Sequence, residues 1–298
     1  MRHLKSLGVA AMAMLALGAI AAGPAMAKQD VWSKFAECPL NYPEELNACT
    51  VGKTGPESYF QAGKVTIHFV KPIKLQIGLK EDETAYGDLK IIGAEGGHSV
   101  TKVPEPAPPL TEDINAEALS EPEKARYEAY LAAGKSTKAT ATIELAKPAE
   151  NMEISLAALL SETSDTALEF PVMIRLNNPF VGKYCTVGST QNPINVSFIT
   201  GETSPPPPNV PIHGTLGTIN VIGEGNILQI VGDRLVNNSY ASPGVQNCGI
   251  NGGADAAMNS ALGLPSPAGT NSTELAGELA QAGAEQVREH VKFSKVGP

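Results

Sequence analysis

The sequence predicts a mainly β protein, an antiparallel sandwich or barrel-like single domain with an inserted helix and a C-terminal helix. Three observations lead to this fold class. Apolar residues alternate with polar ones over many short stretches, glycine and proline separate these stretches, and all the cysteines lie beyond an N-terminal export-type segment. Regular short strands separated by turns are typical of sandwiches and barrels. We expect this disulfide-stapled β domain over residues 28–265.

The first 27 residues have the order of a secretory signal peptide. Arg2 and Lys5 give a basic start, residues 7–22 are apolar, and Ala25–Ala27 form a small-x-small cleavage site. The apolar run is shorter than the ~20 residues that span a bilayer. We therefore expect cleavage after Ala27 and a secreted, extracytoplasmic mature chain with no membrane span.

The charge of the chain argues against two classes of partner. Loss of residues 1–27 removes Arg2 and Lys5 but no acid, so that the formal charge falls from −9 to −11. An acidic surface repels phosphate backbones and anionic lipid headgroups. Nucleic acid is therefore not an expected partner. Cell-wall or extracellular components remain open as partners.

Four cysteines remain after export, and an even number in an oxidising compartment favours two disulfides. We expect the pairs Cys38–Cys49 and Cys185–Cys248. The hexamer CTVGKT at 49–54 recurs as CTVGST at 185–190, and an internal duplication would instead make Cys49–Cys185 a credible pair. A zinc site is disfavoured because no CxxC or nearby histidine spacing occurs.

Alternating patterns predict strands along most of the mature chain. Pro72 marks a bend within the first of these stretches, and Glu224–Asn226 read as a hairpin turn within the sixth. The stretches are residues 64–79, 88–94, 138–146, 168–176, 194–201, 217–236 and 237–245.

Residues 103–135 interrupt the strand pattern with a loop and helix excursion. The segment begins rich in proline and acid, and helix formers follow. Ser120 and Glu123 have the spacing of a capping box, and Gly134 is a C-terminal stop signal. The pattern predicts a helix from about Glu121 to Ala133.

The C-terminal part, residues 266–298, is expected to be a linker and a helix. Leu275, Leu279, Val287 and Val291 form an apolar stripe at helical spacing, which predicts a helix over roughly 273–293. The small residues of 251–269 predict a flexible connector before it.

The run Pro205–Pro208 could be a linker between two domains or a stiff loop within one domain. Strand patterns flank it closely, and the expected Cys185–Cys248 bridge spans it. Proline cannot donate to a strand ladder and favours an extended backbone. We expect a crossing between sheets or over a barrel rim, with the two-domain reading as the alternative.

Several of these motifs resemble a group of secreted actinobacterial proteins of unassigned function. The likeness lies in NNPFVGKYCTVGS, NPI, TGETSPPPPNVPI, LVNNSYASPGVQNCG and GLPSPAGTN, and more loosely in FAECPLNYPEELNAC and TATIELA. Glu202 stands where the group has threonine, and Tyr240 where it has phenylalanine. The resemblance implies export and one shared fold. It transfers no catalytic residue, and residues 103–135 have no clear counterpart.

No motif predicts a catalytic, cofactor-binding or metal-binding residue. The sequence lacks GxSxG, HExxH, Walker A, EF-hand and GxGxxG patterns. We expect the histidines of the mature chain to lie on the surface: His68, His98, His213 and His290. The acid clusters are expected to be solvated: Glu81-Asp82-Glu83, Glu112-Asp113 and Glu121/Glu123. A glycosidase-type acid pair is possible in principle, but Trp32 is the only tryptophan available as a sugar platform.

We therefore expect a non-catalytic cell-envelope or extracellular structural or binding protein. Two alternatives stay open: a secreted hydrolase that uses carboxylates, and a carrier of a small apolar ligand in a β-barrel. A pocket with two facing acids would favour the hydrolase, a large dry cavity the carrier, and a filled core without a concave site the structural protein.

Overall fold

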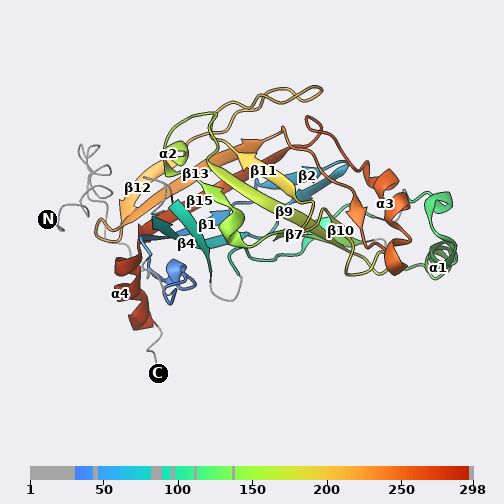
Figure 1. The fold of residues 1–298 in the computed structure, drawn as a ribbon, viewed down its shortest axis with the longest axis horizontal. Helices are drawn as coiled ribbons and strands as arrows, with labels where there is room; N and C mark the ends of the chain where they lie inside the picture. Colours follow the sequence, from blue (N-terminus) through green and yellow to red (C-terminus); the bar gives the residue numbers. More distant parts are fainter. Residues whose placement is uncertain are drawn as a thin grey trace. The chain divides into compact units, whose positions relative to one another are not determined.

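The computed structural model describes residues 31–42, 46–81, 89–94, 98–110, 113–135 and 138–294. Residues 292–294 are described by their backbone only. The expected signal peptide and its cleavage site after Ala27 lie outside the described residues. The strands form two sheets in which all neighbouring strands are antiparallel (Figure 1).

The first sheet places the last strand of the chain at its centre. β2 (Tyr59–Ala62) pairs with β15 and with β3 (Val65–His68) beside the main path. The main path runs in the order β12 (Thr218–Ile222), β13 (Ile227–Asn237), β15 (Thr273–Gly283), β1 (Ala48–Thr54), β4 (Lys74–Glu81) and β5 (Leu89–Gly93).

The second sheet is built around the long strand β9 (Leu168–Asn177), which pairs with four others. Two of them, β11 (Ile194–Phe198) and β8 (Glu153–Ile154), lie off the main path. The main path runs in the order β14 (Val245–Gln246), β10 (Thr186–Val187), β9, β7 (Ala139–Leu145) and β6 (Glu105–Ala107).

The inner faces of the two sheets share one apolar core. Leu75, Ile77 and Leu79 of β4 and Ile174 and Leu176 of β9 belong to the same buried cluster. Such alternating inward residues from both layers are what a sandwich buries. Both sheets are open at their edges in the described part of the chain, so the sandwich is the alternative that the structure confirms over the barrel.

Four α-helices accompany the sheets in the described residues: α1 (Glu121–Ala132), α2 (Leu156–Leu159), α3 (Asp255–Leu262) and α4 (Ala284–Ser294). Short 3₁₀ turns lie at Ser33–Phe35, Ala116–Ala118, Ala149–Asn151 and Ile250–Gly252. The expected inserted helix is confirmed as α1. Gly134, in the left-handed region at φ 58°, ends it as predicted.

The prediction of a helix over 273–293 is wrong for its first half. Residues 273–283 form β15, and only Ala284–Ser294 are helical. Leu275 and Leu279 are four residues apart, and this spacing places them on one face of a helix and also on one face of a strand. Pairing with β13 on one side and β1 on the other then decides the conformation, since tertiary context overrides local propensity.

Three smaller expectations are also corrected. The connector 251–269 contains helix α3, which Gly263 ends in a left-handed conformation. Residues 238–244 form only one isolated bridge, Ser242 with Ser266. Within the excursion 103–135, β6 returns to the second sheet and pairs with β7, and its Glu105 accepts the backbone N–H groups of Val70 and Lys71.

The proline run lies in a crossing between the sheets, as one of the two alternatives predicted. β11 before it belongs to the second sheet, and β12 after it belongs to the first. Asn209, which follows the run, donates its backbone N–H to Gly269 and its side-chain amide to the carbonyls of Asn238 and Asn271. These bonds fix the end of the crossing to the segment that leads into β15.

Glu123 does not close a capping box with Ser120. Its carboxylate is fully buried and binds the guanidinium of Arg126 and the backbone N–H of Ile250, at 2.6 Å for the latter. Arg126 lies one turn further along α1, and the Ile250 N–H comes from the closely packed turn Ile250–Gly253, whose Gly253 carbonyl also accepts the N–H of Ser120. α1 and α3 accordingly lie near each other in Figure 1. Glu123 thus connects the inserted helix to the segment that carries Cys248.

We predict that Glu123→Ala lowers the free energy of unfolding by about 2–4 kcal/mol, because it leaves a buried N–H and a guanidinium without their acceptor. Glu121→Ala, at an exposed position in the same first turn, is the matched control and should change it by less than about 0.5 kcal/mol. Urea denaturation of both variants checks this. Equal losses would show that the buried contact contributes nothing specific.

Candidate functional site

The residues that the sequence singled out do not gather into one site. His68, His98, His213 and His290 are all exposed, and Trp32 is buried and stacks on His290 at 4.1 Å between ring centroids. Of the acid clusters, Glu81, Asp113 and Glu121 are exposed, while Asp82, Glu83 and Glu112 lie outside the described residues. Glu123 is the exception to the expectation of solvated charge. No group of three or more metal-binding side chains occurs among the described residues.

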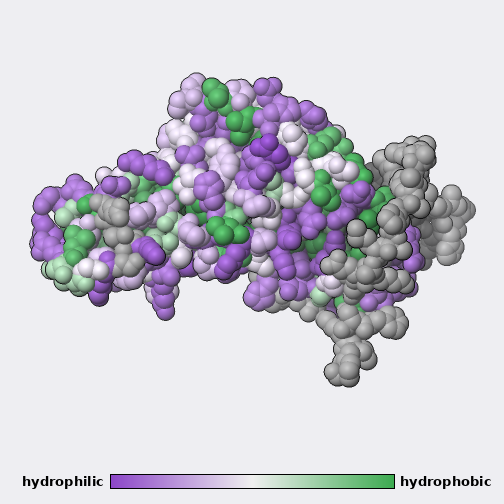
Figure 2. Space-filling view, turned by 180° about the vertical axis from the view of Figure 1, so that it is seen from behind, coloured by the Kyte–Doolittle hydropathy of each residue, from purple (hydrophilic) through white to green (hydrophobic). Residues whose placement is uncertain are grey.

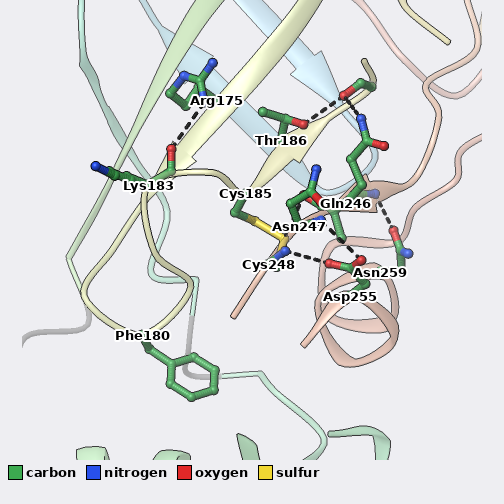
Figure 3. The surroundings of a disulfide bond; sticks show 12 residues. Arg175, Phe180, Lys183, Cys185, Thr186, Gln246, Asn247, Cys248, Asp255 and Asn259 are labelled. Carbon is green, nitrogen blue, oxygen red and sulfur yellow. Dashed lines mark hydrogen bonds between the residues drawn. A yellow bond between two sulfur atoms is a disulfide. The ribbon is translucent and has the colours of Figure 1, made fainter. Parts of the chain in front are cut away.

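The two expected disulfides are present. Cys38–Cys49 and Cys185–Cys248 have Cα–Cα distances of 5.9 Å and 4.2 Å. The two CTVG hexamers lie in different sheets, at β1 and at β10, and their cysteines do not pair with each other. Around the second disulfide, Asp255 accepts the backbone N–H groups of Asn247 and Cys248 and so fixes the turn that holds Cys248 (Figure 3).

A cavity of about 110 Å³ lies between the two sheets. Its lining is almost entirely apolar, and the cavity is partly open to solvent. Leu145, Phe170 and Leu275 in its lining are half-buried. The first sheet contributes Gly52, Lys53, Thr54, Phe60, Leu75, Asp233, Leu235, Leu275, Ala276, Gly277, Glu278 and Leu279. The second sheet contributes Ile143, Glu144, Leu145, Leu168, Phe170, Val172, Val196 and Phe198.

Gly52 contributes to the hollow on the side of the first sheet. It lies between Leu75 of β4 and Leu279 of β15, so this row has one position without a side chain, opposite the large apolar residues of the second sheet. A methyl group added at Gly52 would meet Leu75 at an ordinary contact distance of 3.5 Å, so there is room for it without a clash. Gly277, between Asp233 of β13 and Thr54 of β1, instead allows a close approach of the backbone, because a methyl group there would collide with the Lys53 carbonyl.

A β-bulge turns Asp233 toward this cavity. The register of β13 against β15 shifts between Val231 and Asp233, and Gly232 has the left-handed φ of 76° that such bulges use. Because side chains alternate along a strand, the extra residue puts Ile230, Asp233 and Leu235 on the inner face. The burial pattern agrees: these three are buried, whereas Val231, Gly232 and Arg234 are exposed.

The carboxyl group of Asp233 is poorly solvated and incompletely bonded. The residue is 7% exposed, and its Oδ1 has no hydrogen-bond partner among the described residues. Burial raises the pKa of Asp233 to about 6, and the charge of Glu278 adds to the increase, although the interaction of the carboxylate with its own backbone N–H opposes it. Charge on this group is therefore disfavoured in the unliganded cavity.

The other acids near the cavity lie on the outer faces of the sheets. Glu144 follows the inward Ile143 in β7, and Arg175 and Lys102 bind its carboxylate. Burial alone would raise the pKa of Glu144, but these two cations bring it below its ordinary value. Glu278 accepts from Gln229 on the outer face of the first sheet. Asp233 therefore has no acid facing it across the cavity, which argues against an acid-pair hydrolase.

A second hollow, of about 570 Å³, lies beside the Cys185–Cys248 disulfide and is polar. Its Gln246 donates to the Gly188 carbonyl, and its Arg175 donates to the Lys183 carbonyl (Figure 3). Arg175 also binds the Glu144 carboxylate. None of the buried side-chain atoms that lack a hydrogen bond among the described residues belongs to this hollow. The inter-sheet cavity, with its unpaired Asp233 Oδ1, is the stronger candidate site.

The apolar residues on the outer surface form no comparable site. On the face drawn in Figure 2 they occur in small groups between polar residues. Ile219 and Val221 of the edge strand β12 and Val231 of β13 are 40–50% exposed. Scattered apolar side chains of this kind are normal for a protein surface.

Sequence reasoning missed Asp233, although a signal was present. Simple alternation through IVGDRLV puts the aspartate on the polar side, where a charged residue is ordinary. Gly232 within that strand is the sign of a bulge, and counting one extra residue would have placed Asp233 inside.

The described residues also include no helix long and apolar enough to cross a membrane.

We predict that Asp233→Asn raises the free energy of unfolding above that of the native protein, and that this increase is largest above about pH 7. The unfolded chain releases this proton near its ordinary pKa of 3.8, whereas the folded protein keeps it until about pH 6. The carboxyl therefore destabilises the fold increasingly between these values, by up to about 3 kcal/mol. The difference in unfolding free energy between variant and native protein should rise from pH 4 to pH 7. Parallel urea titrations measure it, and curves that stay parallel across this range would contradict the burial of Asp233.

Comparison with protein-family models, with curated proteins and with solved structures found no match to this chain.

Proposed function

We propose that the mature chain is an exported binding protein that holds a small apolar molecule between its two sheets. The observation that supports this most directly is the inter-sheet cavity, which is largely apolar on both walls and partly open to solvent. A filled core would have favoured the purely structural alternative. The cavity instead favours the carrier alternative, in a sandwich rather than in a barrel.

The size of the cavity limits the ligand. An engineered apolar cavity of about 150 Å³ stays dry and takes up benzene or xenon. About 110 Å³ is smaller, so by the same scaling it holds roughly four to six non-hydrogen atoms, and a longer ligand would extend through the open part of the cavity. At ordinary ligand efficiencies such a group contributes about 4–6 kcal/mol, which corresponds to a Kd from about 1 mM down to tens of micromolar.

Export is part of the proposal and rests on the sequence and the disulfides. The N-terminal 27 residues have the order of a signal peptide, and the described cysteines all form disulfides, as is usual in oxidising compartments. An acidic, exported protein with a small apolar cavity is suited to bind apolar molecules in the cell envelope or the medium.

We predict that filling the cavity abolishes binding of a small apolar probe without unfolding the protein. Gly52→Val projects two methyl groups beside Leu75 and should weaken toluene binding by about tenfold or more, with Gly52→Ala intermediate. Both changes replace glycine within a strand, so stability should be unchanged or higher by up to about 1 kcal/mol. Isothermal titration calorimetry and urea denaturation of the mature protein provide the two readouts.

Asn220→Val is the matched control, because it adds the same side chain to the exposed face of β12. It should bind toluene like the native protein. If the native protein does not bind toluene, or if Gly52→Val binds it equally well, the inter-sheet cavity is not a ligand site.

A further inference from the structure

Asp233 is the only polar side chain with an unpaired, buried oxygen on the inner wall of the cavity in the described part of the chain. The bulge at Gly232 directs it inward, and the residue opposite it on β15 is Gly277, which has no side chain to cover it. On the other side, the lining residues of the second sheet are apolar except Glu144, whose carboxylate is bound by Arg175 and Lys102. Buried polar oxygens in proteins almost always accept a hydrogen bond, so we expect a ligand in the cavity to donate one to Asp233 Oδ1.

The charges around the cavity are predominantly negative. Glu278 lies next to Asp233 along β15 and raises the proton affinity of Asp233, while the negative charge of Glu144 is balanced by Arg175 and Lys102. Lys53, which also lines the cavity, is an exposed residue that pairs across from Glu278 in the outward-facing register of β1, and it does not bond to Asp233 Oδ1. No cation from the described residues therefore bonds to Asp233 from within the protein.

We propose that Asp233 accepts a hydrogen bond from an amino group of the ligand, so that the cavity selects small apolar primary amines. This inference rests on the proposed function and specifies its ligand class. The apolar body of the ligand fills the space beside Gly52, and its amino group lies at Asp233 next to Gly277.

The chemistry of this position favours an amino group over a hydroxyl or a carboxylate group on the ligand. An ammonium group supplies the charge-assisted hydrogen bond that a lone carboxylate lacks, and such bonds are about twice as strong as neutral ones. A hydroxyl group also donates but carries no charge. A carboxylate ligand would bring a second negative charge beside Asp233 and Glu278, and it is excluded by repulsion and by burial.

The test uses four probes of one size: toluene, benzyl alcohol, benzylamine and benzoate. Calorimetric titration of the mature protein at pH 7.5 should give the affinity order benzylamine, benzyl alcohol, toluene, with benzylamine about tenfold or more above toluene and no binding of benzoate. Asp233→Asn should bind benzylamine and toluene within about threefold of each other. Lowering the pH to 5 should reduce the preference of the native protein and not that of the variant.

Glu278→Gln is the matched control, since it removes a neighbouring negative charge from the outer face and leaves Asp233 in place. It should keep most of the amine preference. Toluene binding without an amine preference, or an amine preference that survives Asp233→Asn, would overturn the role of Asp233 and leave the cavity function intact. Failure of the native protein to bind toluene would instead refute the proposed function itself.

Discussion

The pairing of β15 with both β13 and β1 is the interaction on which the rest of the structure depends. It joins the end of the chain to a strand near its beginning, with continuous register from Ala48–Gly283 to Thr54–Gly277. On its other edge, β15 sets the register of β13 and the position of the bulge at Gly232. Without this strand, the first sheet would divide into separate ladders, and neither Gly277 nor Asp233 would face the second sheet.

The sequence predicted the elements whose signals are local. The hairpin between β12 and β13, helix α1 and both disulfides follow from turn residues, helix formers and cysteine spacing. β15 was not predictable in this way, because Leu275 and Leu279 suit a helix as well as a strand. Its partners lie far away in sequence, so only the assembled sheet decides between the two conformations.

The candidate site was even less accessible to sequence reasoning. A cavity depends on which residues face one another across two sheets, and here Gly52 has no side chain opposite those from β7, β9 and β11. Asp233 is a second case, because one extra residue at Gly232 reverses the side to which it points. Burying an acid in this wall lowers stability at neutral pH, which is typical of a position kept for binding rather than for folding.

The central claim is that the space between the sheets is a ligand site. A crystal structure of the mature protein under xenon pressure tests it most directly, because xenon enters apolar cavities and needs no polar partner. The account predicts xenon density beside Gly52, bounded by Leu75, Leu279 and Phe198. Side chains that fill this space and exclude xenon would contradict it.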